Sequence, residues 1–110
     1  MRRTTTPTHT FECDIDPSTI SALNITYAQS FEVCGCTEED KETKIVLVKT
    51  LEDVTIEENT IKVKLTQLET NKFVSDIPVE IQLHAIVGND SLQSDIFIVP
   101  CRRVLNDEVL

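Results

Sequence analysis

The chain has 110 residues, of which 40% are apolar, and its 19 acidic and 10 basic side chains give a net charge of −9. This length and apolar content suit a single domain with one core. The acidic excess opposes binding to nucleic acid and to anionic membranes, and few aromatic rings are present for stacking on bases. We therefore expect no direct contact with nucleic acid or with a membrane.

The first residues predict an extended arm. Residues 4–10 are polar where a signal peptide needs an apolar run, so the chain is expected to fold in a cytosol. Threonine and proline favour extended backbone over helix. An arm over residues 1–10 can add to the sheet edge of a neighbouring protein, while residues 11–110 are predicted to form the domain. The arm residues expected to contact a partner are Arg2, Arg3, Thr5 and Pro7.

Alternating apolar and polar residues predict about seven short strands. They are expected at residues 8–13, 20–29, 44–50, 53–56, 60–66, 79–87 and 91–99. Within the third, Ile45 to Val48 is apolar on both faces, which is typical of a strand covered on both sides. The irregular segment from Phe31 to Thr43 is expected to be a projecting hairpin loop, and a short last strand is expected near Val104.

The fifth of these strands has the clearest pattern. Ile61, Val63 and Leu65 share one face, while Lys62 and Lys64 share the other, which indicates one dry and one wet side. These two lysines project positive charge from an acidic chain. They can offset nearby glutamates, protect a sheet edge or contact a partner.

A short helical turn is predicted near residues 67–72, because Thr66 and Glu69 have the spacing of a capping box. Together these elements predict an all-β fold. The expected architecture is a single antiparallel β-sandwich, immunoglobulin-like, with a small barrel as the alternative.

The cysteines permit three interpretations. They can pack as thiols, form disulfides in one of three connectivities, or bind zinc as a four-cysteine site. Only one closely spaced pair is present, and it is Cys-x-Cys rather than the usual Cys-x-x-Cys. The weak candidates for metal binding are Cys13, Cys34, Cys36 and Cys101.

The sequence predicts neither an enzyme nor a cofactor. His9 and His84 are the only histidines, and no placed nucleophile accompanies either of them. Adjacent carboxylates on a strand point to opposite faces, so the acidic pairs do not converge by default. No glycine-rich phosphate loop or calcium-binding loop is present.

A resemblance supplies the functional expectation. The segments that carry it are residues 1–11 (MRRTTTPTHTF), 25–29 (ITYAQ), 60–67 (TIKVKLTQ), 79–83 (VEIQL), 94–96 (SDI) and 104–109 (VLNDEV). Together they resemble a family of short proteins encoded in tailed bacteriophages and prophages of Gram-positive and gut bacteria. The segment around Cys34-Gly35-Cys36 is peculiar to this sequence.

This resemblance implies a small β-sandwich that serves as a virion or assembly protein associated with the head, tail or fibres. Such a protein acts through contacts with other phage structural proteins and with further copies of itself. It is expected in the host cytoplasm during assembly and then in the virion. The alternatives are a phage-encoded regulator or inhibitor directed at the host, and a small metal- or redox-responsive module built on Cys34 and Cys36.

Overall fold

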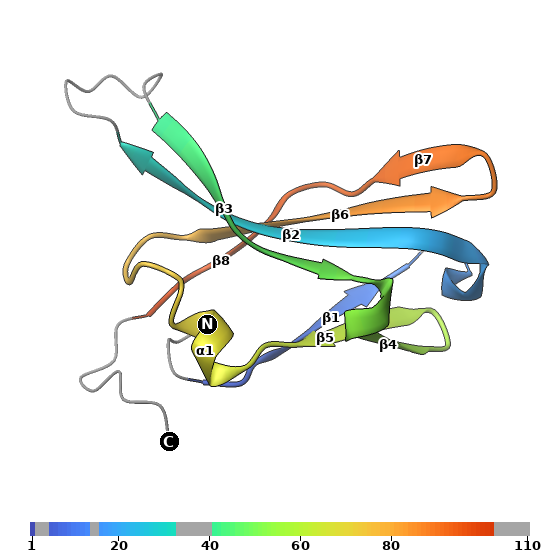
Figure 1. The fold of residues 1–110 in the computed structure, drawn as a ribbon, viewed down its shortest axis with the longest axis horizontal. Coiled ribbons are helices and arrows are strands. Elements are labelled where there is room, and N and C mark those ends of the chain that lie inside the picture. The colour runs from blue at the N-terminus through green and yellow to red at the C-terminus, as the bar shows by residue number, and fades with distance from the viewer. Residues whose placement is uncertain (2–4, 14–15, 33–40, 103–110) are drawn as a thin grey trace.

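The computed structural model describes residues 1, 5–13, 16–32 and 41–102, and its strands form two antiparallel sheets (Figure 1). The small sheet has the order β1-β5-β4, and the large sheet has the order β3-β2-β6-β7, with β8 also paired to β6. The strands are β1 (Thr8–Glu12), β2 (Ile20–Glu32), β3 (Lys41–Thr50), β4 (Val54–Glu57), β5 (Thr60–Lys64), β6 (Val79–Val87), β7 (Asp90–Gln93) and β8 (Phe97–Val99).

The core lies between the two sheets, and alternation explains which side chains enter it. Ile61 and Val63 of β5 are buried, and Leu65, which directly follows the strand, is buried with them. They pack with inward residues of β2 and β6 such as Ile25 and Ile81. The all-β antiparallel prediction is confirmed. The described strands form two open sheets rather than a barrel, while the immunoglobulin-like assignment stays a prediction.

The predicted capping box is present. The main-chain N–H of Thr66 donates to Glu69 Oε1 at 2.9 Å, and the N–H of Glu69 donates to Thr66 Oγ1 at 3.2 Å. This reciprocal pair starts the single-turn helix α1 (Gln67–Thr70), which is shorter than the predicted 67–72. The helix follows β5 directly, so it lies at one end of the small sheet (Figure 1).

Two strand predictions were wrong in detail. The stretch Ile45 to Val48 is not covered on both sides, because β3 is an edge strand on which Ile45 and Val48 are exposed. The predicted strand 91–99 is two strands, β7 and β8, which both pair with β6. The break comes at Ser94, whose hydroxyl accepts the N–H of Leu83 at 2.9 Å.

A bulge in β3 shifts its register with β2. The shift comes between Tyr27 and Ala28 and leaves Val46 of β3 as the extra residue. Such bulges re-aim side chains within a strand. In β2 itself alternation continues, so Gln29 is buried on the same face as Tyr27, while Ala28 lies on the opposite face beside Glu80.

Residues 1–10, expected to be an arm for a neighbouring protein, are bonded in their described part to the same chain. The N–H of Leu65 donates to the carbonyl of Pro7 at 3.0 Å, and the hydroxyl of Thr70 donates to the carbonyl of Thr5 at 3.0 Å. Residues 8–10 belong to β1, and the ammonium of Met1 donates to Pro100 at 2.7 Å.

Three expectations fall outside the described residues. They concern the tip of the hairpin loop at residues 33–40, part of the predicted turn at residues 14–15, and the last strand near Val104.

Candidate functional site

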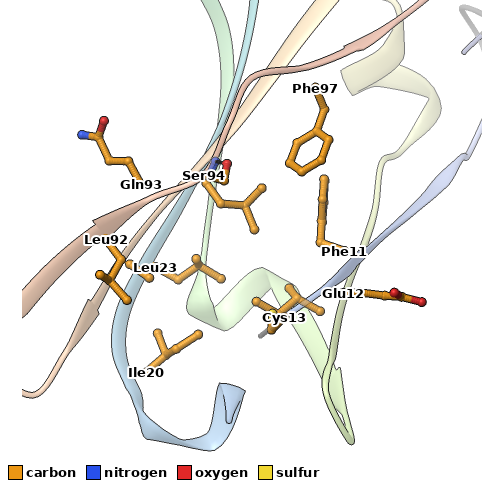
Figure 2. A pocket seen from close by; sticks show the side chains of 12 residues that line it. Phe11, Glu12, Cys13, Ile20, Leu23, Leu92, Gln93, Ser94 and Phe97 are labelled. Carbon is orange, nitrogen blue, oxygen red and sulfur yellow. Dashed lines mark hydrogen bonds between the residues drawn. The ribbon is translucent and has the colours of Figure 1, made fainter. Parts of the chain in front are cut away.

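An apolar groove opens along the seam between β1 of the small sheet and β7 and β8 of the large sheet (Figure 2). We call it the seam groove; its volume is about 250 Å³. Phe11 and Cys13 form one wall, while Leu92 and Phe97 form the other, with Leu23 between them. Both sheets therefore contribute to it, and its lining is mainly hydrophobic.

The mouth of the seam groove exposes apolar side chains to solvent. The rings of Phe11 and Phe97 are 5.5 Å apart, and Figure 2 shows them next to each other. Phe11 is buried, but Phe97 and Leu92 are 44% and 42% exposed. Exposed apolar surface that is contiguous often marks a site of contact with another protein.

Polar side chains are few in the lining of the seam groove. Glu12 points away from the groove in Figure 2. The Ser94 hydroxyl is already used, since it donates to the carbonyl of Asp95 at 2.8 Å and accepts from Leu83. The rest of the described lining is mainly hydrophobic, so the groove is suited to holding apolar side chains.

The strand β1 borders this groove with an open edge. The carbonyl of Pro7 accepts from Leu65, and the N–H of Cys13 donates to Asn59 at 2.8 Å, so odd-numbered residues direct their main chain toward β5. Thr8, Thr10 and Glu12 must therefore direct theirs to the other side. Among the described strands none pairs with that side.

A second apolar surface lies on the outer face of the large sheet. Ile98, Glu80, Ala28 and Ile45 are successive cross-strand partners on β8, β6, β2 and β3. Both isoleucines of this row are exposed. Val48 and Ile96 are also exposed. A shallow hollow of about 160 Å³ lies on this face, lined by Thr26, Ala28, Thr43, Ile45, Glu80, Gln82 and Ile96. A solvated sheet face is usually polar, so this outer face is a candidate contact surface.

A buried polar pair links the two sheets. His9 Nδ1 lies 2.8 Å from the Tyr27 hydroxyl, and the Tyr27 side chain is fully buried against Phe73. Burial lowers the pKa of His9, with a further contribution from the positive N-terminus. Burial and the charge of Glu69 raise the pKa of Tyr27. Both groups are therefore neutral at neutral pH, and their contact joins β1 of the small sheet to β2 of the large sheet.

An ion pair joins β3 to α1. Lys49 Nζ contacts Glu69 Oε2, and the two side chains are only 13% and 16% exposed. Burial opposes the charge of Glu69, but hydrogen bonds from Lys49 and from the main chain of Thr66, together with the Lys49 charge, hold its pKa below the usual value. This pair fastens the helical turn to the edge of the large sheet.

The predicted partner-binding lysines have separate environments. Lys62 Nζ lies 2.8 Å from Glu57 Oε2, so one lysine does offset a neighbouring glutamate. Lys64 is exposed and makes no ion pair within the described part of the chain. Neither protects an edge, because β5 is the central strand of the small sheet.

The other predicted contact residues belong to the N-terminal segment. Thr5 and Pro7 are half-buried and bonded to their own domain. Arg2 and Arg3 lie outside the described residues.

The structure separates the cysteines that it describes. Cys13 is half-buried in the seam groove, whereas Cys101 is buried beside a different hollow that Asp76 also lines. Cys34 and Cys36 lie outside the described residues. Across residues 1, 5–13, 16–32 and 41–102, no group of three or more metal-ligating side chains gathers. The thiol, disulfide and zinc interpretations stay predictions.

Sequence reasoning missed Leu92 and Phe97 as site residues. Both were assigned to one continuous strand, and pattern alone does not say which strand edges face each other. The available signal was the polar run Gln93-Ser94-Asp95, which interrupts the apolar residues where the strand breaks.

Comparison with known proteins does not identify a role for the seam groove or for the outer face of the large sheet. No family model, curated protein or solved structure matches the chain. Within the described part, no helix is long and apolar enough to cross a membrane.

Proposed function

We propose that this protein is a non-enzymatic virion or assembly component of a tailed bacteriophage, present in several copies and acting through protein-protein contacts. The observation that carries the proposal is the exposed apolar row on the outer face of the large sheet, Ile45 and Ile98 above all. The resemblance of residues 1–11, 60–67 and 79–83 to phage proteins adds the biological setting.

The chemistry of this face favours a protein partner. Covering an isoleucine side chain contributes about 1.5–3 kcal/mol, enough for two or three such anchors to hold a specific contact. Glu80 lies in the same row, and the chain as a whole has a charge of −9, which opposes contact with packaged nucleic acid. We propose that the partners are other structural proteins of the particle, met first in the host cytoplasm.

Purified particles test this function directly. Mass spectrometry should detect the protein in particles of the phage that encodes it. Ile45→Lys and Ile98→Lys should each lower its incorporation about tenfold, the effect of losing roughly 1.4 kcal/mol of contact energy.

Leu68→Lys is the matched control, because Leu68, Ile45 and Ile98 are all 67% exposed and Leu68 lies on α1, away from this face. Its incorporation should equal that of the unchanged protein. Absence of the unchanged protein from particles would overturn the proposal, and specific capture of a host protein would then favour the host-directed regulator.

A further inference from the structure

We propose that two copies of this chain pair through β1, antiparallel and about a two-fold axis at Thr10, so that their small sheets join into one continuous sheet. This inference deepens the proposed function, resting on it only for the expectation that several copies act together. It uses the edge of the small sheet rather than the outer face of the large sheet.

The edge of β1 is the least protected of the described sheet edges. The edge strand β3 carries Lys44 and Lys49, and the opposite edge of the large sheet is broken between β7 and β8. The strand β4 has only 4 residues. By contrast, β1 keeps an unbroken register and contains neither lysine nor proline. Proteins normally guard open edges with such devices, so an unguarded edge is suited to receiving a strand.

The direction of the main-chain groups selects the register. Thr8, Thr10 and Glu12 direct their N–H and C=O groups away from β5. Two copies can satisfy all of these groups when Thr10 pairs with Thr10. Thr8 of each copy then lies opposite Glu12 of the other. Threonine pairs are favourable across strands, and no two like charges meet directly.

Charge on the outer side of the small sheet fits the same register. Lys64 is the cross-strand partner of Thr8 within one copy. In the proposed pair, Glu12 of the second copy lies on the other side of Thr8, two strand spacings or about 9.5 Å from Lys64. Long side chains can narrow that gap. Glu57 pairs with Lys62, so Lys64 has no ion pair among the described residues. The two-fold axis gives two Lys64–Glu12 pairs in the dimer.

The seam groove supplies the apolar part of the contact. The strand β1 forms one lip of the groove, so pairing two β1 edges brings the mouths of two grooves together. Leu92 and Phe97, which are exposed in one copy, are then covered by the other. On the inner side, His9 of each copy lies opposite Phe11 of the second.

Two substitutions on β1 test the register. The purified chain should show a monomer–dimer equilibrium in sedimentation velocity. Thr10→Lys places two like charges opposite each other at the axis and should raise the dimer Kd about tenfold, whereas Thr8→Lys faces Glu12 twice and should lower it about threefold. Within one copy the two variants are matched, because each places its new lysine opposite an existing lysine of β5. Thr10 lies opposite Lys62, and Thr8 lies opposite Lys64. Equal melting temperatures will show that both fold.

Amide hydrogen exchange gives a second readout. With rising protein concentration, the amides of Thr8, Thr10 and Glu12 should become protected, while those of His9 and Phe11 should be protected throughout. A monomer at every concentration, or a shift in the same direction for both variants, would overturn the inference. Protection of these amides only on adding another protein would also overturn it, in favour of a strand from that protein.

These measurements use the purified chain and are independent of particles. Loss of pairing with normal incorporation into particles overturns the dimer and leaves the proposed function standing. A dimer that forms in solution but is absent from particles overturns the proposed function and leaves the dimer standing.

Discussion

His9 Nδ1 lies 2.8 Å from the hydroxyl of Tyr27, and this contact joins β1, the edge of the small sheet, to β2, an interior strand of the large sheet. The tyrosine is fully buried and the histidine half-buried. This polar pair therefore adds to the hydrogen bonds with β5 that hold β1, and β1 borders both the seam groove and the proposed dimer edge. The contribution of this pair to the stability of the fold can be tested separately from function.

Stability should fall in mild acid because of His9. Its folded pKa lies below the usual value of about 6.5, so the unfolded chain takes up a proton more readily. The contribution is thus fully present above about pH 6.5 and declines as the pH falls toward the lowered pKa. Melting temperatures between about pH 7.5 and pH 5 should fall less for His9→Gln than for the unchanged chain.

The control for this prediction is His84→Gln. His84 contacts the Ser91 hydroxyl at 2.6 Å on the outer face of the large sheet. Because His84→Gln removes the other histidine of the chain, comparing it with His9→Gln shows whether the pH dependence depends on His9. If all three proteins share one dependence, His9 is not the titrating group.

Tyr27→Phe should destabilise the fold without loosening its packing. The substitution keeps the ring that contacts Phe73 but removes the hydroxyl that His9 uses. An unpaired, partly buried imidazole nitrogen costs about 1–2 kcal/mol, measurable as a lower urea midpoint at unchanged slope. Combining this change with His9→Gln gives a double-mutant cycle. Simple additivity of the two losses would show that the pair is not coupled.

Glu69→Gln should cost about 1–3 kcal/mol at neutral pH, between the values for exposed and fully buried ion pairs. Glutamine can still complete the capping box with Thr66, so the loss reports on Lys49, which is left charged and largely buried. The lowered pKa of Glu69 means that this contribution is present above the usual carboxyl pKa and disappears as the pH falls through the lowered one.

The matched comparison is Glu57→Gln, which breaks the exposed pair with Lys62. Its unfolding midpoint should move much less than that of Glu69→Gln. Equal losses in the two variants, or a Glu69→Gln difference that persists in acid, would contradict the assignment.

The alternation of apolar and polar residues was sufficient to predict the strands that have one buried face. Ile61 and Val63 enter the core as the pattern predicts, and the predicted bounds of β6, Val79–Val87, are those observed. The capping box at Thr66 is equally local, since its two hydrogen bonds span three residues. Such features depend on neighbours in the chain and can be predicted from them.

The seam groove depends on neighbours in space instead. Whether Ile45 faces a second layer or solvent depends on which face of the large sheet the small sheet covers, and composition alone does not determine that. The contact of Phe11 with Phe97 joins residues far apart in the sequence, on two different sheets. The strand over residues 8–13 could be predicted from its pattern, but nothing local shows that β5 is its partner.

Gln29 is a polar side chain at a position of β2 that alternation points into the core. Its buried amide donates to the carbonyls of Val74 and Ile77 at 2.9 and 3.0 Å and accepts the N–H of Val74 at 2.9 Å. Gln29→Leu keeps much of the volume but leaves three main-chain groups unsatisfied, so unfolding free energy should fall by about 2–4 kcal/mol. Gln29→Glu should cost at least as much at neutral pH, because it buries a carboxylate against the carbonyl oxygens of Val74 and Ile77.

The loss of stability in Gln29→Leu should be accompanied by faster local opening of the main chain around Val74. Amide exchange at Val74 should accelerate in Gln29→Leu while the amide of Ile25, within the core of β2, stays protected. Gln82→Leu is the comparison, because that amide makes one hydrogen bond, to Ser94 at 2.9 Å, and is less buried. A loss in Gln82→Leu as large as in Gln29→Leu would mean that the three hydrogen bonds of Gln29 do not give it a special role.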